Sequence, residues 1–316
     1  MSYGLQHIVH MRSKDRDENS YPDPSGYRTV LSHPIAIPPG HCVVASLQSA
    51  QIPFSFYPVN SKNNTLITQV TTDAGTTDNT DTVTLTSGNY TATELRDEIQ
   101  SKLRATGNFS DTAESGVPKL EVTYDSKTNK YTITATALAG AAAEDCNVTI
   151  KANTTCGKLL GLKESILTSD VPFADAEAAS VSLISPYAIN VAGDDTIYLR
   201  TNLGTGRSMS YETRTQNSGD LLAKIPIRVS PFSIIHYDAD ESTFKAQIKD
   251  SGQIDEVQVR LTDSENRPIN FNGIDNEISI KFEVVRKPDF ENYELMKRDP
   301  YKQDRTLYRP KQQKEK

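Results

Sequence analysis

Apolar and polar side chains alternate along much of the chain with a period of two residues. In residues 256–261 and again in residues 277–284, every second side chain is apolar and those between are polar or charged. This period is typical of β-strands that bury one face and expose the other. Similar short segments, separated by polar, Gly or Pro turns, fill residues 182–285. Strands at this spacing predict an antiparallel β-sandwich.

Two further strands are expected near the N-terminus. LQHIVHMRS, residues 5–13, is a candidate first strand, and HCVVASLQSAQIPFSFY, residues 41–57, predicts a longer one. The first half of the longer segment is apolar at both alternating sets of positions, which indicates that both faces are buried. Because Pro53 has no backbone N–H, we expect pairing to end there or Pro53 to lie at a sheet edge.

One helix is expected between the strands. Thr91-Ala92-Thr93-Glu94 has the sequence of a capping box. In this motif the side chains of the first and last residues each accept a hydrogen bond from the other's backbone amide. Gly107 is placed to stop the helix. A single apolar stripe follows the box, formed by Leu95, Ile99 and Leu103. So narrow a stripe predicts a helix that lies on the surface of a sheet with its other side in water.

The helix belongs to a segment that differs from the rest of the chain. A hairpin over residues 119–137 and a short strand at residues 147–151 follow it, which predicts a small inserted α+β module. We therefore divide the chain into a first strand or N-terminal arm (1–20), a sandwich in two segments (21–82 and 164–287), the inserted module (83–163) and a C-terminal arm (288–316).

Composition narrows the class of protein. The chain has 316 residues, of which 36% are apolar, and a net charge of -7. So low an apolar fraction favours thin layers with exposed edges. We expect no membrane span and no export signal, because the sequence has neither a long apolar run nor a leader pattern. The acidic charge argues against nucleic acid as a partner, except through a basic tail.

The charge is divided unevenly. Residues 286–316 contain ten Lys or Arg and six Asp or Glu, whereas residues 1–285 contain 24 and 35. Aromatic residues and prolines recur among the charges of this tail, so we expect an extended arm that docks on a neighbour. A solvated, partly disordered terminus remains the alternative. With the charged cluster near the N-terminus, the candidate partner-binding residues are Arg12, Arg16, Tyr293, Tyr301, Arg305, Tyr308 and Arg309.

No motif predicts catalysis or cofactor binding. Gly157-Lys158 lacks the upstream glycine and the following Ser or Thr of a phosphate-binding loop. On a strand, the spacing of His7 and His10 puts them on opposite faces, which disfavours a metal site. Cys42 and the histidine before it point apart for the same reason, and Cys42 is expected to be a small core residue. We predict no catalytic residue, no metal ligand and no cofactor.

Several segments, in their order along the chain, resemble the motifs of a known family. They are SKDRDENSYPDPSGYRTVL, VVASLQSAQIPFSFYPVNSKNNTL, LTSGNYTATELRDEIQSKL, VTYDSKTNKYTIT, CGKLLGL and EVQVRLTDSENRPINFNGIDNEISIKFEV. This set is similar to the jelly-roll minor capsid and related virion structural proteins of large nucleocytoplasmic DNA viruses, over roughly residues 5–285. The resemblance implies a mainly β fold, an antiparallel jelly-roll-like β-sandwich with a small inserted α+β module and extended termini.

The resemblance also implies a function. Such a chain is a non-enzymatic structural protein, a minor capsid component made in the host cytoplasm and located in the virion. Its partners are the major capsid protein and other minor capsid proteins, and a homo-oligomer is compatible with this role. Two alternatives stay open. One is a receptor- or glycan-binding attachment protein, with Tyr187, Tyr211 and Phe232 as candidate contacts, and the other is an enzyme whose site combines residues far apart in sequence.

Overall fold

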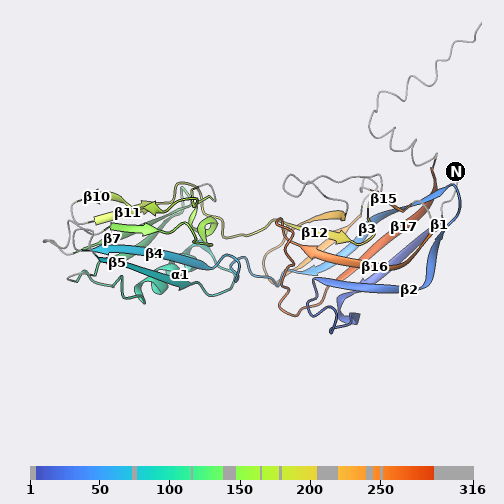
Figure 1. Cartoon of the computed structure of the whole chain (residues 1–316), viewed down its shortest axis with the longest axis horizontal. Coiled ribbons are helices and arrows are strands. Elements are labelled where there is room, and N and C mark those ends of the chain that lie inside the picture. Colours follow the sequence, from blue (N-terminus) through green and yellow to red (C-terminus); the bar gives the residue numbers. More distant parts are fainter. Residues whose placement is uncertain are drawn as a thin grey trace, which may run out of the picture. The chain divides into compact units, whose positions relative to one another are not determined.

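The computed structural model describes residues 5–72, 77–114, 117–137, 147–163, 166–177, 180–204, 220–239, 245–249 and 252–287. The chain forms two compact units (Figure 1). The first unit combines the chain up to Phe56 with the chain from Asp195, and the second is formed by Tyr57–Asp194.

The first unit contains two antiparallel sheets. One has the order β1 (Leu5–Arg12), β17 (Glu277–Arg286), β3 (His41–Pro53) and β14 (Ile234–Asp238), with β15 (Ala246–Lys249) also paired to β3. The other has the order β13 (Leu221–Pro226), β12 (Thr196–Thr201), β16 (Gly252–Thr262) and β2 (Gly26–Ile37). The chain passes between the sheets at β1–β2, β2–β3, β13–β14, β15–β16 and β16–β17, so many consecutive strands lie in different sheets.

The alternating pattern places one apolar face of each sheet in a shared core. Leu47 and Phe282 of the first sheet and Tyr27, Ile197 and Val259 of the second are all buried in one cluster. Burying an apolar side chain of this size contributes about 1.5–3 kcal/mol relative to exposure, so this core accounts for the stability of the sandwich. The mainly β, antiparallel sandwich fold expected from the sequence is confirmed.

The second unit also has two antiparallel sheets. Their orders are β10 (Ala174–Glu177), β11 (Ser180–Ile184), β7 (Lys130–Thr136), β6 (Lys119–Asp125), and β5 (Thr77–Thr84), β4 (Thr65–Thr72), β8 (Asn147–Ile150), β9 (Val171–Pro172). Both sheets and the helix α1 (Ala92–Arg104) contribute to a second core, as Leu66, Leu95 and Ile133 show. A short 3-10 helix, η2 (Gly157–Leu160), adds buried leucines to it.

Helix α1 begins as the sequence predicts. Thr91 Oγ1 accepts a hydrogen bond from the Glu94 amide at 3.2 Å, and Glu94 Oε2 accepts from the Thr91 amide at 2.8 Å. The expected stripe of Leu95, Ile99 and Leu103 is buried. The helix ends at Arg104, before the expected stop at Gly107, with Ala105 as its C-cap.

Helix α1 also covers the edge of β6. Arg104 Nε and Nη2 donate to the Leu120 carbonyl oxygen at 2.9 and 2.7 Å, and Gln100 Oε1 accepts from the Val122 amide at 2.8 Å. These side chains satisfy backbone groups that would otherwise be open to another strand. Blocking of this kind prevents edge-to-edge association.

The structure draws the domain boundaries differently from the sequence analysis. Residues 57–82 and 164–194 were assigned to the sandwich, but β4 pairs with β5 and β8, and β11 pairs with β7. The inserted unit is therefore 57–194 and not 83–163. A period of two residues identifies a strand, but it carries no information about which strand becomes its neighbour.

The prediction for the N-terminal segment can be compared with the structure, and the prediction for the C-terminal arm cannot. Residues 5–12 form a strand of the first unit, β1, whose register with β17 is continuous from Leu5 to Arg12. The candidate first strand is thereby confirmed, and these residues are not a free arm. The predicted C-terminal arm, residues 288–316, lies outside the described residues.

Candidate functional site

The segment that joins β1 to β2 is fixed to the chain just before β17. It begins with a short 3-10 helix, η1 (Ser13–Asp15), whose first residue is fully buried. The Ser13 amide donates to the Asn276 carbonyl at 3.0 Å, and Ser13 Oγ donates to Asp275 Oδ1 at 2.7 Å. The Asn276 amide donates back to Ser13 Oγ at 2.9 Å. These contacts extend the β1–β17 ladder by one residue and end it.

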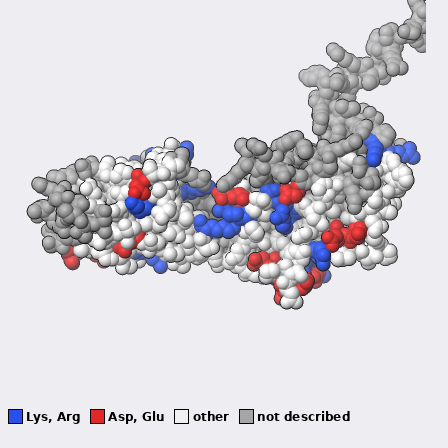
Figure 2. Space-filling view, in the orientation of Figure 1, with Lys and Arg blue, Asp and Glu red and all other residues white. Residues whose placement is uncertain are grey.

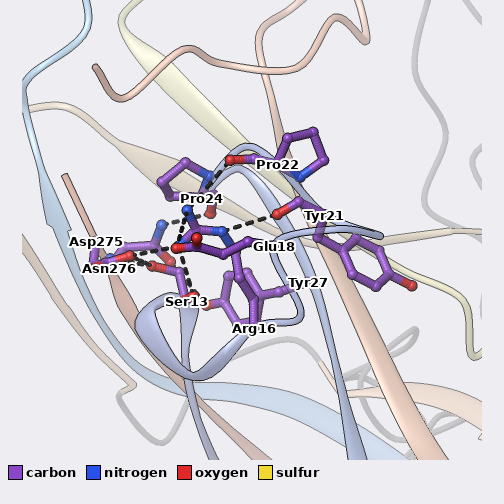
Figure 3. Close-up of polar contacts among 9 residues, drawn as sticks. All are labelled: Ser13, Arg16, Glu18, Tyr21, Pro22, Pro24, Tyr27, Asp275 and Asn276. Atoms are coloured by element: carbon purple, nitrogen blue, oxygen red, sulfur yellow. Dashed lines mark hydrogen bonds and ion pairs between the residues drawn. The ribbon is translucent and has the colours of Figure 1, made fainter. Parts of the chain in front are cut away.

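Arg16 lies at the centre of this arrangement (Figure 3). Its Nε donates to the Tyr21 carbonyl at 3.0 Å, Nη1 to the Ser13 carbonyl at 3.0 Å, and Nη2 to the Pro22 carbonyl at 3.3 Å. Nη1 also lies 3.0 Å from Asp275 Oδ1, and only 8% of the side chain is exposed. A planar guanidinium with five donors suits this role, because it can bind several carbonyl oxygens at once.

Tyr27 connects the same group to the second sheet. Its hydroxyl donates to Asn276 Oδ1 at 2.8 Å, and Asn276 Nδ2 donates to the Pro24 carbonyl at 2.9 Å. Burial raises the pKa of Tyr27, and the nearby charges of Glu277 and Asp275 raise it further. The hydroxyl therefore stays protonated and remains a donor. We call Ser13, Arg16, Tyr27, Asp275 and Asn276 the N-terminal lock.

The lock holds an acidic surface in place. Asp15, Asp17, Glu18 and Asp23 lie on the same segment with exposed side chains, and we call them the acidic loop. Hydrogen bonds from the Ser20 hydroxyl and the Asn19 amide lower the pKa of Asp17, so this carboxylate is ionised at neutral pH. Figure 2 shows acidic side chains gathered at the lower margin of the first unit.

The structure describes two of the seven predicted partner-binding residues, Arg16 and Arg12. Arg16 cannot serve a partner as expected, because its guanidinium is buried and its donors are used within the chain. Arg12 remains half exposed and forms an ion pair with Asp15, with Nη2 and Oδ2 2.7 Å apart. The remaining five candidates, Tyr293, Tyr301, Arg305, Tyr308 and Arg309, lie outside the described residues.

Sequence reasoning missed the two residues that complete the lock. Asp275 and Asn276 precede the last strand, where a polar pair is ordinary turn sequence. One signal could have indicated a buried role: Ser13 and Arg16 both belong to the first of the resembling motifs. Their partners belong to the last of these motifs, so the lock joins the two ends of the pattern.

The other histidine and cysteine side chains considered for chemistry lie within the fold. His10 Nδ1 lies 2.8 Å from Ser279 Oγ. Cys42 and Cys156 are both buried, and burial raises the pKa of the Cys156 thiol to about 12, which makes it a poor nucleophile. Within the residues described, no group of three or more His, Cys, Asp or Glu is placed to hold a metal ion. In the same part of the chain, no helix is long and apolar enough to cross a membrane.

Two of the three aromatic residues considered for attachment can be placed. Tyr187, in the second unit, is 43% exposed, and Lys163 Nζ lies 3.7 Å from its ring centroid. Phe232, in the first unit, is 78% exposed. Tyr211 lies outside the described residues.

Fold and site together define an antiparallel β-sandwich protein that carries a second, β-rich unit as an insertion and a polar lock at its N-terminal segment. The chain belongs to a family of unknown function, DUF5901, whose sequence profile matches residues 4–282. No curated protein matches it.

Two solved structures are similar to the chain. The mavirus penton protein shares 10% identity at a TM-score of 0.46, over 89% of this chain and 100% of that chain. A chain from the cryo-EM structure of the Sputnik virophage shares 16% identity at a TM-score of 0.43, over 91% of this chain and 99% of that chain.

Proposed function

We propose that this chain is a non-enzymatic structural protein of a virion, a minor capsid component that contacts and stabilises neighbouring capsid proteins. This function agrees with the sequence resemblance to jelly-roll minor capsid proteins of large DNA viruses. The expected partners are the major capsid protein and other minor capsid proteins. In this role the chain is made in the host cytoplasm and ends in the capsid.

The proposal rests on one observation: residues of the first and last resembling motifs bind to each other and hold the fold together. Ser13, Arg16 and Tyr27 come from the first motif and Asp275 and Asn276 from the last, and a continuous series of hydrogen bonds links the five. These polar residues hold the fold together, and their donors and acceptors face each other instead of a cavity. Motifs of this kind are expected in a protein whose task is to keep a fixed shape.

The lock also supports a role in assembly. Because it fixes the acidic loop to the sandwich, little conformational entropy is left to lose when a partner binds there. The C-terminal segment supplies the complementary chemistry, with Tyr and Arg residues that commonly anchor interfaces. Nucleic acid is a partner only through this basic segment.

The test is to look for the chain in particles. Virions purified from cells that produce it are dissociated mildly, and the fractions are examined by electron microscopy and mass spectrometry. The proposal expects the chain in the particle at a fixed ratio to the major capsid protein. Its absence from washed particles would refute the proposal.

A receptor- or glycan-binding attachment protein is the second candidate. It is favoured by the exposure of Phe232 and Tyr187, because exposed aromatic rings commonly stack on sugars. A glycan array probed with the full chain distinguishes the two. Binding that Phe232→Ala or Tyr187→Ala removes would support attachment, and an array without signal would exclude glycan recognition.

A further inference from the structure

β1 has one unpaired edge within the part of the chain that the structure describes. Its inner side pairs with β17, and no described strand pairs with its outer side. The Ser13 amide bonds to Asn276 one step further along the same ladder, so odd-numbered residues direct their backbone groups to β17. Since this direction alternates in an antiparallel pair, the outer edge presents the N–H and C=O groups of Gln6, Ile8, His10 and Arg12.

Two other edges, those of β6 and β2, carry features that hinder pairing. The β6 edge is capped by Arg104 and Gln100 of helix α1. The β2 edge contains Pro34, and its register with β16 is interrupted between Val30 and Ile35. β1 has neither a proline nor an irregularity over its eight residues. An edge left open in this way is suited to β-strand addition.

The side chains of β1 add apolar surface to this edge. Leu5 is 63% exposed and Ile8 is 50% exposed. The two side chains lie on opposite faces of the sheet, and a strand added at this edge would cover part of each. The same strand would pair with the outward-facing backbone groups of Gln6, Ile8, His10 and Arg12.

We propose that the outer edge of β1 accepts residues 301–309 of a second copy of the chain as an added antiparallel strand. This inference rests on the proposed role of the C-terminal segment in assembly. It names the surface that receives the segment and the identity of the partner.

The length of the segment fits the edge. The chain continues for 29 residues after Lys287, and Pro300 and Pro310 enclose nine residues, YKQDRTLYR. Proline cannot donate to a strand ladder, so pairing is confined to the residues between the two prolines. Nine residues match the eight of β1.

The charges also fit an antiparallel arrangement. In that orientation the start of the segment lies at the Arg12 end of β1, where the acidic loop begins. Lys297 and Arg298 precede the segment and therefore fall towards Asp15 and Asp17. Opposite charges at the two ends of a contact favour this orientation over the reverse.

Geometry favours a second copy over the chain's own tail. β17 leaves the sheet beside Leu5, since Leu5 pairs with Val284. To pair antiparallel, a chain's own segment would first have to run the length of β1, about 26 Å, and then turn back. The segment of a second copy is not tethered at the Leu5 end and therefore has no such constraint. Such a contact joins two different surfaces, so repetition builds a ring or an open chain of copies.

Crosslinking in the full chain tests the proposal. Cys146 is first replaced by Ser, and the natural thiols of Cys42 and Cys156 are buried. One preparation then carries Ile8→Cys and a second, with a longer tag, carries Thr306→Cys. The two are mixed, treated with a short thiol-to-thiol crosslinker and separated by size. Val30→Cys, at an exposed position of the β2 edge, replaces Ile8→Cys in the matched control.

We expect a product of one long and one short chain, about tenfold above the control, because pairing raises the effective concentration of the two thiols. A product of two Ile8→Cys chains alone would mean that β1 pairs with β1, and would overturn the proposal. A yield equal to the control would overturn it as well. A third preparation carries both Ile8→Cys and Thr306→Cys, and a crosslink found only within single chains of that preparation would also overturn the proposal. None of these results bears on whether the chain is found in particles, so a capsid role could fail or hold independently.

Discussion

Arg16 Nη1 and Asp275 Oδ1 lie 3.0 Å apart although the two residues are separated by 259 positions in the sequence. This contact, with the carbonyl oxygens that Arg16 collects, ties the segment after the first strand to the segment before the last. The loop between β1 and β2 is thereby fixed to the sandwich.

Removing the Arg16 side chain should destabilise the first unit. Arg16→Ala removes a largely buried guanidinium that donates to three carbonyl oxygens and to the Asp275 carboxylate, which among the described residues then keeps only its hydrogen bond from Ser13 Oγ. We expect a loss of about 2–4 kcal/mol in the free energy of unfolding. Urea unfolding followed by circular dichroism measures the loss, and hydrogen exchange should show faster exchange in β1. Arg12→Ala, which breaks an exposed ion pair, should cost less than about 1 kcal/mol. Equal effects of the two variants would contradict the role given to Arg16.

Tyr27→Phe tests the second half of the lock. The variant keeps the buried ring but removes the hydroxyl that donates to Asn276 Oδ1. A buried acceptor without its donor costs about 1–3 kcal/mol, and the same unfolding experiment should register it. Tyr198→Phe is the control, because this half-buried ring lies under Lys224 and should keep that contact. If Tyr27→Phe were as stable as the control, the hydrogen bond to Asn276 would not contribute.

Glu283 should make stability depend on pH in the acid range. Burial alone would raise its pKa, but hydrogen bonds from Lys245 and Lys281 outweigh burial and lower it. Glu283 Oε2 lies 2.5 Å from Lys245 Nζ, and Oε1 lies 2.8 Å from Lys281 Nζ. Because the folded pKa is below the unfolded one, the stabilisation is present above the ordinary pKa of Glu and is lost as pH falls through the lowered value.

Comparison of Glu283→Gln with the natural chain measures this contribution. The difference in unfolding midpoint should be largest at about pH 7 and should shrink as the pH falls below the ordinary pKa of Glu, because the carboxylate then becomes protonated in the natural chain as well. Glu256→Gln, which removes an exposed partner of Arg28, should show little difference at either pH. A difference for Glu283→Gln that does not change with pH would rule out this account.

The cap of helix α1 should matter for the second unit. Thr91→Ala removes the oxygen that accepts from the Glu94 amide, at a cost of about 0.5–2 kcal/mol. Thr93→Ala, two residues further on the exposed side of the first turn, should be neutral or slightly stabilising, since alanine is the better helix former. Thermal unfolding of both variants makes the comparison, and the reverse order would show that the cap is not the source of stability.

Truncation after Lys287 separates folding from assembly. All described strands and both cores lie within residues 5–287, so the truncated chain should keep its unfolding midpoint. It should lose self-association or incorporation into particles, measured by light scattering and by analysis of purified particles. An unfolded truncated chain would contradict the description of residues 288–316 as an assembly arm.

Local patterns were enough to predict many individual elements. The alternation in residues 256–261 and 277–284 depends only on which side chains can face a core, and both segments are strands in the structure. The capping box at Thr91 and the stripe of Leu95, Ile99 and Leu103 likewise involve residues close in sequence, and they form as expected. Each of these features needs no information about a distant partner.

Which of these elements pair or contact one another depends on the tertiary structure. A strand that pairs inside the sandwich has the same sequence pattern as one that pairs inside the insert. The sequence therefore predicts β4, β5, β9, β10 and β11 in the sandwich, whereas the structure pairs them in the second unit. The sequence also does not show that Arg16 turns inward, because its partner Asp275 is brought beside it only by the pairing of β1 with β17. Alternation fixes the face that a residue presents, whereas pairing between strands far apart in sequence depends on the packing of the whole core.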